Sequence, residues 1–312
     1  MADRALVLVL VLCGMAQACQ PAAKPQPGNG PRAESARAPA PPPAAAAVSL
    51  TAKLPRDEGP FYPSQARTEA GKPIDIEALN DVRACAGCHT EAVRQWGSSA
   101  HAHASFDNPW YRASVESLRS EVSLEASRHC AGCHDPVLLL AGGMDREIKP
   151  EEPLANAGVT CLVCHSVRAV TSDGNASYTL STDPVPYPEQ GDPASLQAHR
   201  ERLAAKPLHT AALCVSCHRG FLGRHTGIGH HLSGMDDPGS WRASSFADTR
   251  SQTPEHVAAQ SCSDCHMRPE TVRSEDAAAR DDRIKSHRFA GAHTPLAQGL
   301  ADARQMQALE EQ

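Results

Sequence analysis

The chain has 312 residues and a net charge of −6, so it lacks the basic surface that nucleic-acid binding requires. Its 5 Phe, 3 Trp and 4 Tyr are little aromatic material for a close-packed core of this size. The sequence also contains 12 cysteines and 16 histidines, and we therefore expect a large apolar cofactor to fill part of the interior.

The first 18 residues predict a secretion signal. Arg4 precedes an apolar run far shorter than the roughly 20 residues that span a bilayer, and Ala16-Gln17-Ala18 resembles a cleavage site. Cys19 follows this site, as in the lipobox of bacterial lipoproteins, although an unmodified cysteine beside an ordinary cleavage site is the alternative. We expect a protein secreted across the inner membrane, either periplasmic or anchored to the outer membrane through a lipid on Cys19.

Residues 19–56 are rich in Pro and Ala and predict a disordered tether, because this composition cannot bury enough apolar surface to offset the entropy of ordering. The remaining residues, 57–312, are expected to form one folded domain.

Within this domain the predicted elements are mainly helices joined by long loops, with little β structure. Four helices are predicted, and the first covers 109–127. The other three each follow a capping residue and a proline. They are 194–205 after Asp192-Pro193, 255–260 after Thr253-Pro254, and 296–309 after Thr294-Pro295. A weak strand signal covers 177–180, and the prolines of 183–188 predict an extended loop.

Ten cysteines fall into five C-x-x-C-H motifs, the attachment pattern of c-type haem. The motifs are Cys85-Ala86-Gly87-Cys88-His89, Cys130-Ala131-Gly132-Cys133-His134, Cys161-Leu162-Val163-Cys164-His165, Cys214-Val215-Ser216-Cys217-His218 and Cys262-Ser263-Asp264-Cys265-His266. Two thiols at this spacing bind the two vinyl groups of one haem, and the histidine that follows supplies a nitrogen ligand to the iron. Zinc sites and disulfides do not require a histidine at that place. We therefore predict five covalently attached haem c groups in a pentahaem domain over 57–312.

The first cysteines of successive motifs lie 31 to 53 residues apart, so the predicted haems must be crowded together. Because electron tunnelling falls steeply with distance, this spacing favours an electron wire or a small electron store.

Eleven further histidines are available as second axial ligands, which is more than five haems need. The candidates are one of His101 and His103, then His209, then His230 or His225, and finally His287 and His293. His129 is a weaker candidate for a neighbouring haem, and His199 and His256 are expected to be surface residues.

The motifs and their surroundings resemble the cytochrome c-554 family of multihaem cytochromes. The resemblance rests on the first motif with Trp96-Gly97-Ser98-Ser99-Ala100-His101, on Gly158-Val159-Thr160 before Cys161, and on Met267 after the last motif. Trp241-Arg242-Ala243-Ser244-Ser245-Phe246 repeats the W-x-x-S-x-H pattern with Phe in place of His. The resemblance covers about 75–295 and implies haems stacked in parallel and perpendicular pairs, mainly with two histidine ligands.

Two departures from the family bear on function. Five motifs replace the four of the family's carriers, and no motif ends in the lysine that common nitrite reductases use at their active haem. We therefore favour an electron carrier between other cytochromes or membrane redox proteins over an enzyme. The alternatives are an oxidoreductase acting on a small nitrogen or sulfur compound at an open haem, and a haem-bearing structural or assembly subunit.

Overall fold

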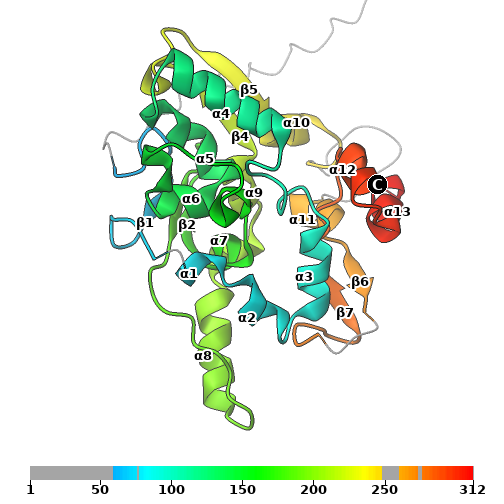
Figure 1. Ribbon diagram of the computed structural model, residues 1–312. Helices are drawn as coiled ribbons and strands as arrows, with labels where there is room; N and C mark the ends of the chain where they lie inside the picture. Colours follow the sequence, from blue (N-terminus) through cyan, green and yellow to red (C-terminus); the bar gives the residue numbers. More distant parts are fainter. Residues whose placement is uncertain (1–58, 76, 248–259, 273–275, 312) are drawn as a thin grey trace, which may run out of the picture. The chain divides into compact units, whose positions relative to one another are not determined.

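The computed structural model describes residues 59–75, 77–247, 260–272 and 276–311 (Figure 1). The predicted secretion signal, Cys19 and the tether over 19–56 lie outside these residues, as do His256 and nearly all of the predicted helix 255–260.

Short helices dominate the described residues, and long loops join them (Figure 1). The α-helices are α1 Glu77–Asn80, α2 Val82–Ala86, α3 Thr90–Gly97, α4 Pro109–Glu121, α5 Arg128–His134, α6 Pro136–Leu140, α7 Cys161–His165, α8 Pro193–Leu203, α9 Ala211–Cys217, α10 Asp237–Ala243, α11 Cys262–His266, α12 Thr294–Gly299 and α13 Ala303–Glu310. The 3₁₀ turns are η1 Glu125–Ser127, η2 Gly143–Asp145, η3 Pro153–Asn156, η4 Lys206–His209 and η5 Arg224–Thr226. The prediction of a mainly helical fold is confirmed. No helix in the described ranges is both long and apolar enough to cross a bilayer.

Three small sheets contain the β structure. Their strands are β1 Arg67–Thr68, β2 Val167–Val170, β3 Tyr178–Leu180, β4 Arg219–Leu222, β5 Leu232–Asp236, β6 Pro269–Thr271 and β7 Arg283–Lys285. In the first sheet β3 is central, parallel to β1 and antiparallel to β2, and it matches the predicted strand 177–180. The pairs β4–β5 and β6–β7 are antiparallel hairpins.

Helices α4 and α8 begin where a capping polar side chain directly precedes a proline. The Asn108 side chain accepts hydrogen bonds from the N–H groups of Trp110 and Tyr111, and Asp192 does the same for Ala194 and Ser195. Helix α8 therefore begins as predicted.

The prediction of one helix over 109–127 was too long. Helix α4 ends at Glu121, and the Ser123 hydroxyl accepts the N–H of Ala126, which starts the separate turn η1. A polar side chain that bonds a nearby backbone N–H competes with helix continuation in this way.

The single helix predicted over 296–309 is instead two helices, α12 and α13. Ala301 has a positive φ of 53°, which a continuous helix does not allow, and Asp302 then caps α13 through the N–H groups of Arg304 and Gln305. Thr294 was predicted to cap this helix, but it is instead the first residue of α12. The residue at the cap position is His293.

The apolar core is concentrated in the first part of the described chain. It runs from Phe61 to Leu180 and includes the buried helix α6 and side chains of α4, α5 and α7. Among the described residues after Leu180, the buried apolar side chains are Val272, Ile284, Ala290 and Ala297. This scarcity matches the expectation that a cofactor contributes to the interior.

Candidate haem sites

Each of the five motif histidines is held by a hydrogen bond from its Nδ1 atom to an oxygen. The partners are the Asp276 carboxylate for His89 (3.3 Å), the Ala104 carbonyl for His134 (3.1 Å), the Leu203 carbonyl for His165 (3.1 Å), the Asp237 carboxylate for His218 (2.9 Å) and the Ala290 carbonyl for His266 (2.6 Å). Because these oxygens accept, Nδ1 carries the proton and the lone pair is on Nε2. This tautomer is the one that binds a metal through Nε2.

The motif cysteines are placed for attachment of a haem. The motifs lie in or beside short helical turns, so that the His89 N–H bonds to the Cys85 carbonyl and the His218 N–H to the Cys214 carbonyl (both 2.8 Å). Two thiols and an imidazole of fixed tautomer are the donor set that haem c requires, and the residues present therefore fit the group.

Three motif histidines face a second histidine from a distant part of the chain. The ring centroids of His89 and His199 are 6.4 Å apart, those of His165 and His287 6.4 Å, and those of His218 and His101 6.2 Å. An iron bonded to two imidazoles at about 2 Å on opposite sides separates the ring centroids by about 6 Å. The three pairs therefore have the spacing that one iron between them requires.

Burial keeps several of these rings neutral, as ligation requires. It lowers the pKa of His101 to about 4, with a further contribution from nearby His218, and it lowers that of His165 to about 4, with a contribution from His287. Burial also lowers the pKa of His134 and of His287.

Helix α8 serves two sites at once. It carries His199, whose Nδ1 donates to the Pro186 carbonyl (2.8 Å), and it ends in Leu203, whose carbonyl holds His165. Buried Arg202 anchors the helix by donating to the Asp183 carbonyl and the Ser166 hydroxyl. His199 was expected to be a surface residue, but the structure makes it half-buried and places it beside His89.

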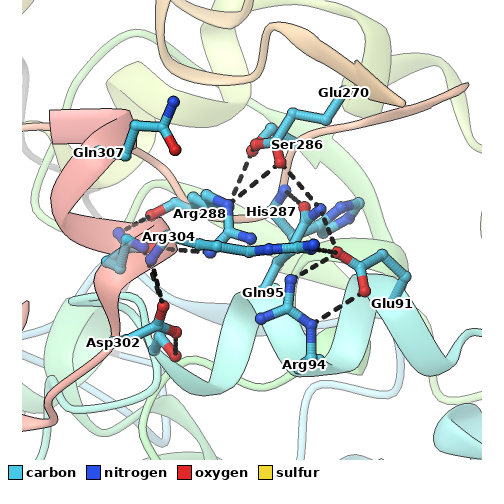
Figure 2. A network of polar contacts seen from close by, with 12 residues as sticks. Glu91, Arg94, Gln95, Glu270, Ser286, His287, Arg288, Asp302, Arg304 and Gln307 are labelled. Atoms are coloured by element: carbon cyan, nitrogen blue, oxygen red, sulfur yellow. Dashed lines mark hydrogen bonds and ion pairs between the residues drawn. The ribbon is translucent and has the colours of Figure 1, made fainter. Parts of the chain in front are cut away.

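His287 is positioned by a buried polar network between α3, the β6–β7 hairpin and α13 (Figure 2). Its backbone N–H donates to Gln95 Oε1 (2.8 Å) and its Nδ1 to the Lys285 carbonyl (2.9 Å). The neighbouring Arg288 is only 2% exposed and binds Glu270 and Gln305. The network fixes the backbone on both sides of this ring.

His101 is fixed by the segment before the third motif. The Trp96 indole N–H donates to the Val159 carbonyl (2.8 Å), and the Val159 N–H donates to the His101 carbonyl (2.8 Å). Gly158 has a φ of +63°, and a Cβ there would lie 2.6 Å from the His101 carbonyl oxygen, so only glycine allows this approach. These contacts explain both the W-x-x-S-x-H pattern and the glycine before the third motif.

The same contacts recur around Phe246. The Trp241 indole N–H donates to the Gln260 carbonyl (2.7 Å), and the Gln260 N–H donates to the Phe246 carbonyl (2.9 Å). Gln260 lies two residues before Cys262, as Val159 lies two residues before Cys161. The sequence repeat is therefore a structural repeat, with Phe246 in the backbone position of His101.

The other predicted second ligands are not brought to a motif histidine. His103 donates from both nitrogens, to Asp107 (2.6 Å) and to the Gly97 carbonyl (3.1 Å), and the Asp107 hydrogen bond raises its pKa, so it has no free lone pair. Between the two candidates the structure favours His101. His293 Nε2 accepts from the Gln305 amide (2.7 Å).

Three further candidates lie around the fourth motif. His225 packs against His129, with ring centroids 5.3 Å apart, and both rings are buried or nearly so. His209 and His230 are exposed. Ligation by any of these residues stays a prediction, and within the described residues His134 and His266 have no second histidine ring beside them. The ring next to His134 is that of Tyr111, 4.9 Å away and nearly parallel.

Cysteines of different motifs lie next to one another. The pKa values show this proximity, because Cys161 lowers the pKa of Cys85, Cys217 raises that of Cys133, and Cys262 raises that of Cys214. The charge of Cys217 also contributes to the raised pKa of buried Cys164. The first motif therefore adjoins the third, and the fourth adjoins the second, third and fifth.

The attachment motifs and the iron-binding tautomer of their histidines are the features of a redox haem protein with c-type haem attachment. Residues 84–166 match the family model described as cytochrome c554 and c-prime, which confirms the resemblance to the cytochrome c-554 family over that stretch. No curated protein matches the chain. A solved structure, a penta-heme cytochrome c552 from Thermochromatium tepidum, is similar with a TM-score of 0.41 and 19% identity, over 72% of this chain and 60% of that chain.

Proposed function

We propose that the protein is a pentahaem c-type cytochrome that carries electrons between redox partners at the bacterial cell envelope. One haem c is attached at each motif, through the paired cysteines, with the motif histidine as the first axial ligand.

The observation that carries this proposal is the pairing of His89 with His199, of His165 with His287 and of His218 with His101. An iron with an imidazole on each face has no free position for a substrate, but it can still change oxidation state. Three sites of this kind favour electron transfer over catalysis.

The contacts between motif cysteines support transfer from haem to haem. A thiol that binds a haem vinyl group lies at the edge of the porphyrin, so adjacent thiols bring porphyrin edges together. The contacts favour a path for electrons from the first haem through the third to the fourth. The second and fifth haems would then lie beside the fourth.

The partners that suit such a protein are other cytochromes or membrane redox proteins. The N-terminal signal favours export, and Cys19 offers a lipid anchor at the end of the 19–56 tether. On this reading the haem domain is periplasmic or held at the outer membrane.

The test is the haem content and spin state of protein matured in a bacterial periplasm. Five haems per chain, measured by mass and by absorbance of the pyridine complex, with mainly low-spin spectra, are expected. Fewer than five haems per chain would refute the pentahaem assignment, and mainly high-spin spectra would refute the carrier.

A second candidate function, an oxidoreductase acting on a small nitrogen or sulfur compound, is favoured by one observation. Phe246 occupies the backbone position of His101 and is 43% exposed, and its side chain cannot ligate iron. A haem facing Phe246 would keep an open coordination position.

Carbon monoxide distinguishes the two candidates. Binding of about one carbon monoxide per reduced chain, abolished by Phe246→His and retained by Phe246→Leu, would favour the oxidoreductase. Absence of binding leaves the carrier as the function.

A further inference from the structure

We propose that Asp276 is a positioning residue that orients His89 and lowers the reduction potential of the haem at the first motif. This inference rests on the proposed ligation of that haem by His89. Asp276 lies far from the first motif in sequence, and it is not among the residues that the sequence predicts to bind haem.

The Asp276 carboxylate is held rigidly against the first motif. One oxygen accepts from His89 Nδ1 (3.3 Å) and from the Ala278 N–H (2.9 Å). The other accepts from the N–H groups of Glu91 and Ala92 (both 3.1 Å), at the start of helix α3. The Ala277 N–H in turn donates to the Cys88 carbonyl (2.9 Å). The carboxylate therefore cannot turn away from the imidazole.

The charge on this carboxylate is both buried and retained. The Asp276 side chain is 0% exposed. Three backbone N–H groups and the His89 imidazole donate to this carboxylate and stabilise its ionised form. A negative charge in a weakly polarisable setting interacts strongly with its neighbours.

A carboxylate behind an axial histidine acts on the iron through the ring. By accepting a hydrogen bond from Nδ1–H, it makes Nε2 a more basic ligand, which stabilises the oxidised iron relative to the reduced iron. The reduction potential of that haem falls as a result.

The other motif histidines provide internal comparisons. His134, His165 and His266 donate to neutral carbonyls, which exert a weaker effect. His218 also donates to a carboxylate, that of Asp237, but this side chain is 63% exposed, and water and salt screen its charge. His89 is thus the motif histidine with a buried carboxylate.

The closest comparison is between the first and third sites. The rings of His89 and His199 are inclined by 11° and those of His165 and His287 by 14°, and both second histidines donate Nδ1 to a carbonyl. The ring geometry of the two sites is therefore alike, and the group that holds the motif histidine differs between them.

The experiment is a redox titration of the full-length, haem-loaded protein and of Asp276→Asn. Asparagine keeps an oxygen for the backbone N–H groups but removes the charge. We expect one of the five midpoint potentials to rise, with five haems and the low-spin spectrum retained. Asp302→Asn is the matched control, because Asp302 also caps a helix, at Arg304 and Gln305, but hydrogen-bonds to no histidine in the part of the chain that the structure describes. Asp237→Asn should raise one potential by a smaller amount.

Five haems with the wild-type spectrum and unchanged potentials in Asp276→Asn would overturn the role of Asp276 and leave the proposed function intact. Fewer than five haems in the wild type would instead refute the proposed function.

If Asp276→Asn does not mature, the wild type still provides the test. A more basic ligand reduces the largest g value in the paramagnetic resonance spectrum of a low-spin haem (gmax), and it also reduces the reduction potential of that haem. The near-parallel pairs His89–His199 and His165–His287 are each expected to give a rhombic signal in this spectrum. The signal with the smaller gmax must titrate at the lower potential. The reverse order would overturn the proposal.

Discussion

His101 and His218 face one another with ring planes inclined by 83°, whereas the other two histidine pairs are nearly parallel. The angle between two axial imidazoles determines how the iron d orbitals split, because each ring donates in the direction normal to its own plane. The three sites are therefore expected to differ in their paramagnetic resonance spectra.

We predict one low-spin signal with a large gmax, from the perpendicular pair, and two rhombic signals from the parallel pairs. Spectra of the oxidised protein at low temperature check this, and His101→Ala should remove the large-gmax signal alone. A spectrum with three rhombic signals and no large-gmax signal would contradict the assignment of His101.

His199→Ala should convert one haem from low spin to high spin, because it removes the imidazole facing His89. Haem content should remain at five, since the cysteines are intact. His209→Ala is the control, because His209 is exposed and outside these pairs. Equal effects of the two changes would show that His199 is not a ligand.

Gly158→Ala should destabilise the protein by an amount on the order of 1–3 kcal/mol, because alanine is strained at positive φ. The added Cβ would also displace the His101 carbonyl, so the large-gmax signal should weaken. Thermal unfolding measures the first effect. Gly299→Ala, where a Cβ would meet no neighbour, should cost nothing. An unchanged melting temperature in Gly158→Ala would contradict the strain.

Stability should fall in mild acid. Burial, with a contribution from His225, lowers the pKa of His129 to about 4, against about 6.5 in an unfolded chain. Between these values the unfolded state binds a proton that the folded state does not, so the free energy of unfolding rises with pH across this window and is at its full value above it.

His129→Gln should therefore reduce the slope of unfolding free energy against pH by up to about 1.4 kcal/mol per pH unit in this window. Denaturant titrations at several pH values measure the slope. His103→Gln is the comparison, because the raised pKa of His103 puts its own window above pH ~6.5. Identical acid slopes for the wild type and His129→Gln would contradict the prediction.

The motifs could be predicted from sequence because haem attachment is local. Two thiols and a histidine within five residues specify the cofactor without reference to the fold. Helix α8 was also predictable, since Asp192 and Pro193 act on the residues next to them. The breaks at Ser123 and Ala301 were missed because helical propensity does not reveal a competing cap.

The second ligands could be predicted only where a motif marked them. His101 belongs to a recurring pattern, whereas His199 lies on a charged helix and gains its role from the position of His89. Asp276 carries no sequence signal of its own. Such relationships arise from long-range packing, which composition and spacing do not encode.

The order in which each site is completed follows from where its second histidine lies in the chain. If the chain is exported from its N-terminus and loaded with haem as proposed, His101 is available before the fourth motif emerges, whereas His287 emerges only after the third motif. Completion of the third site then depends on the arrival of a later segment of the chain.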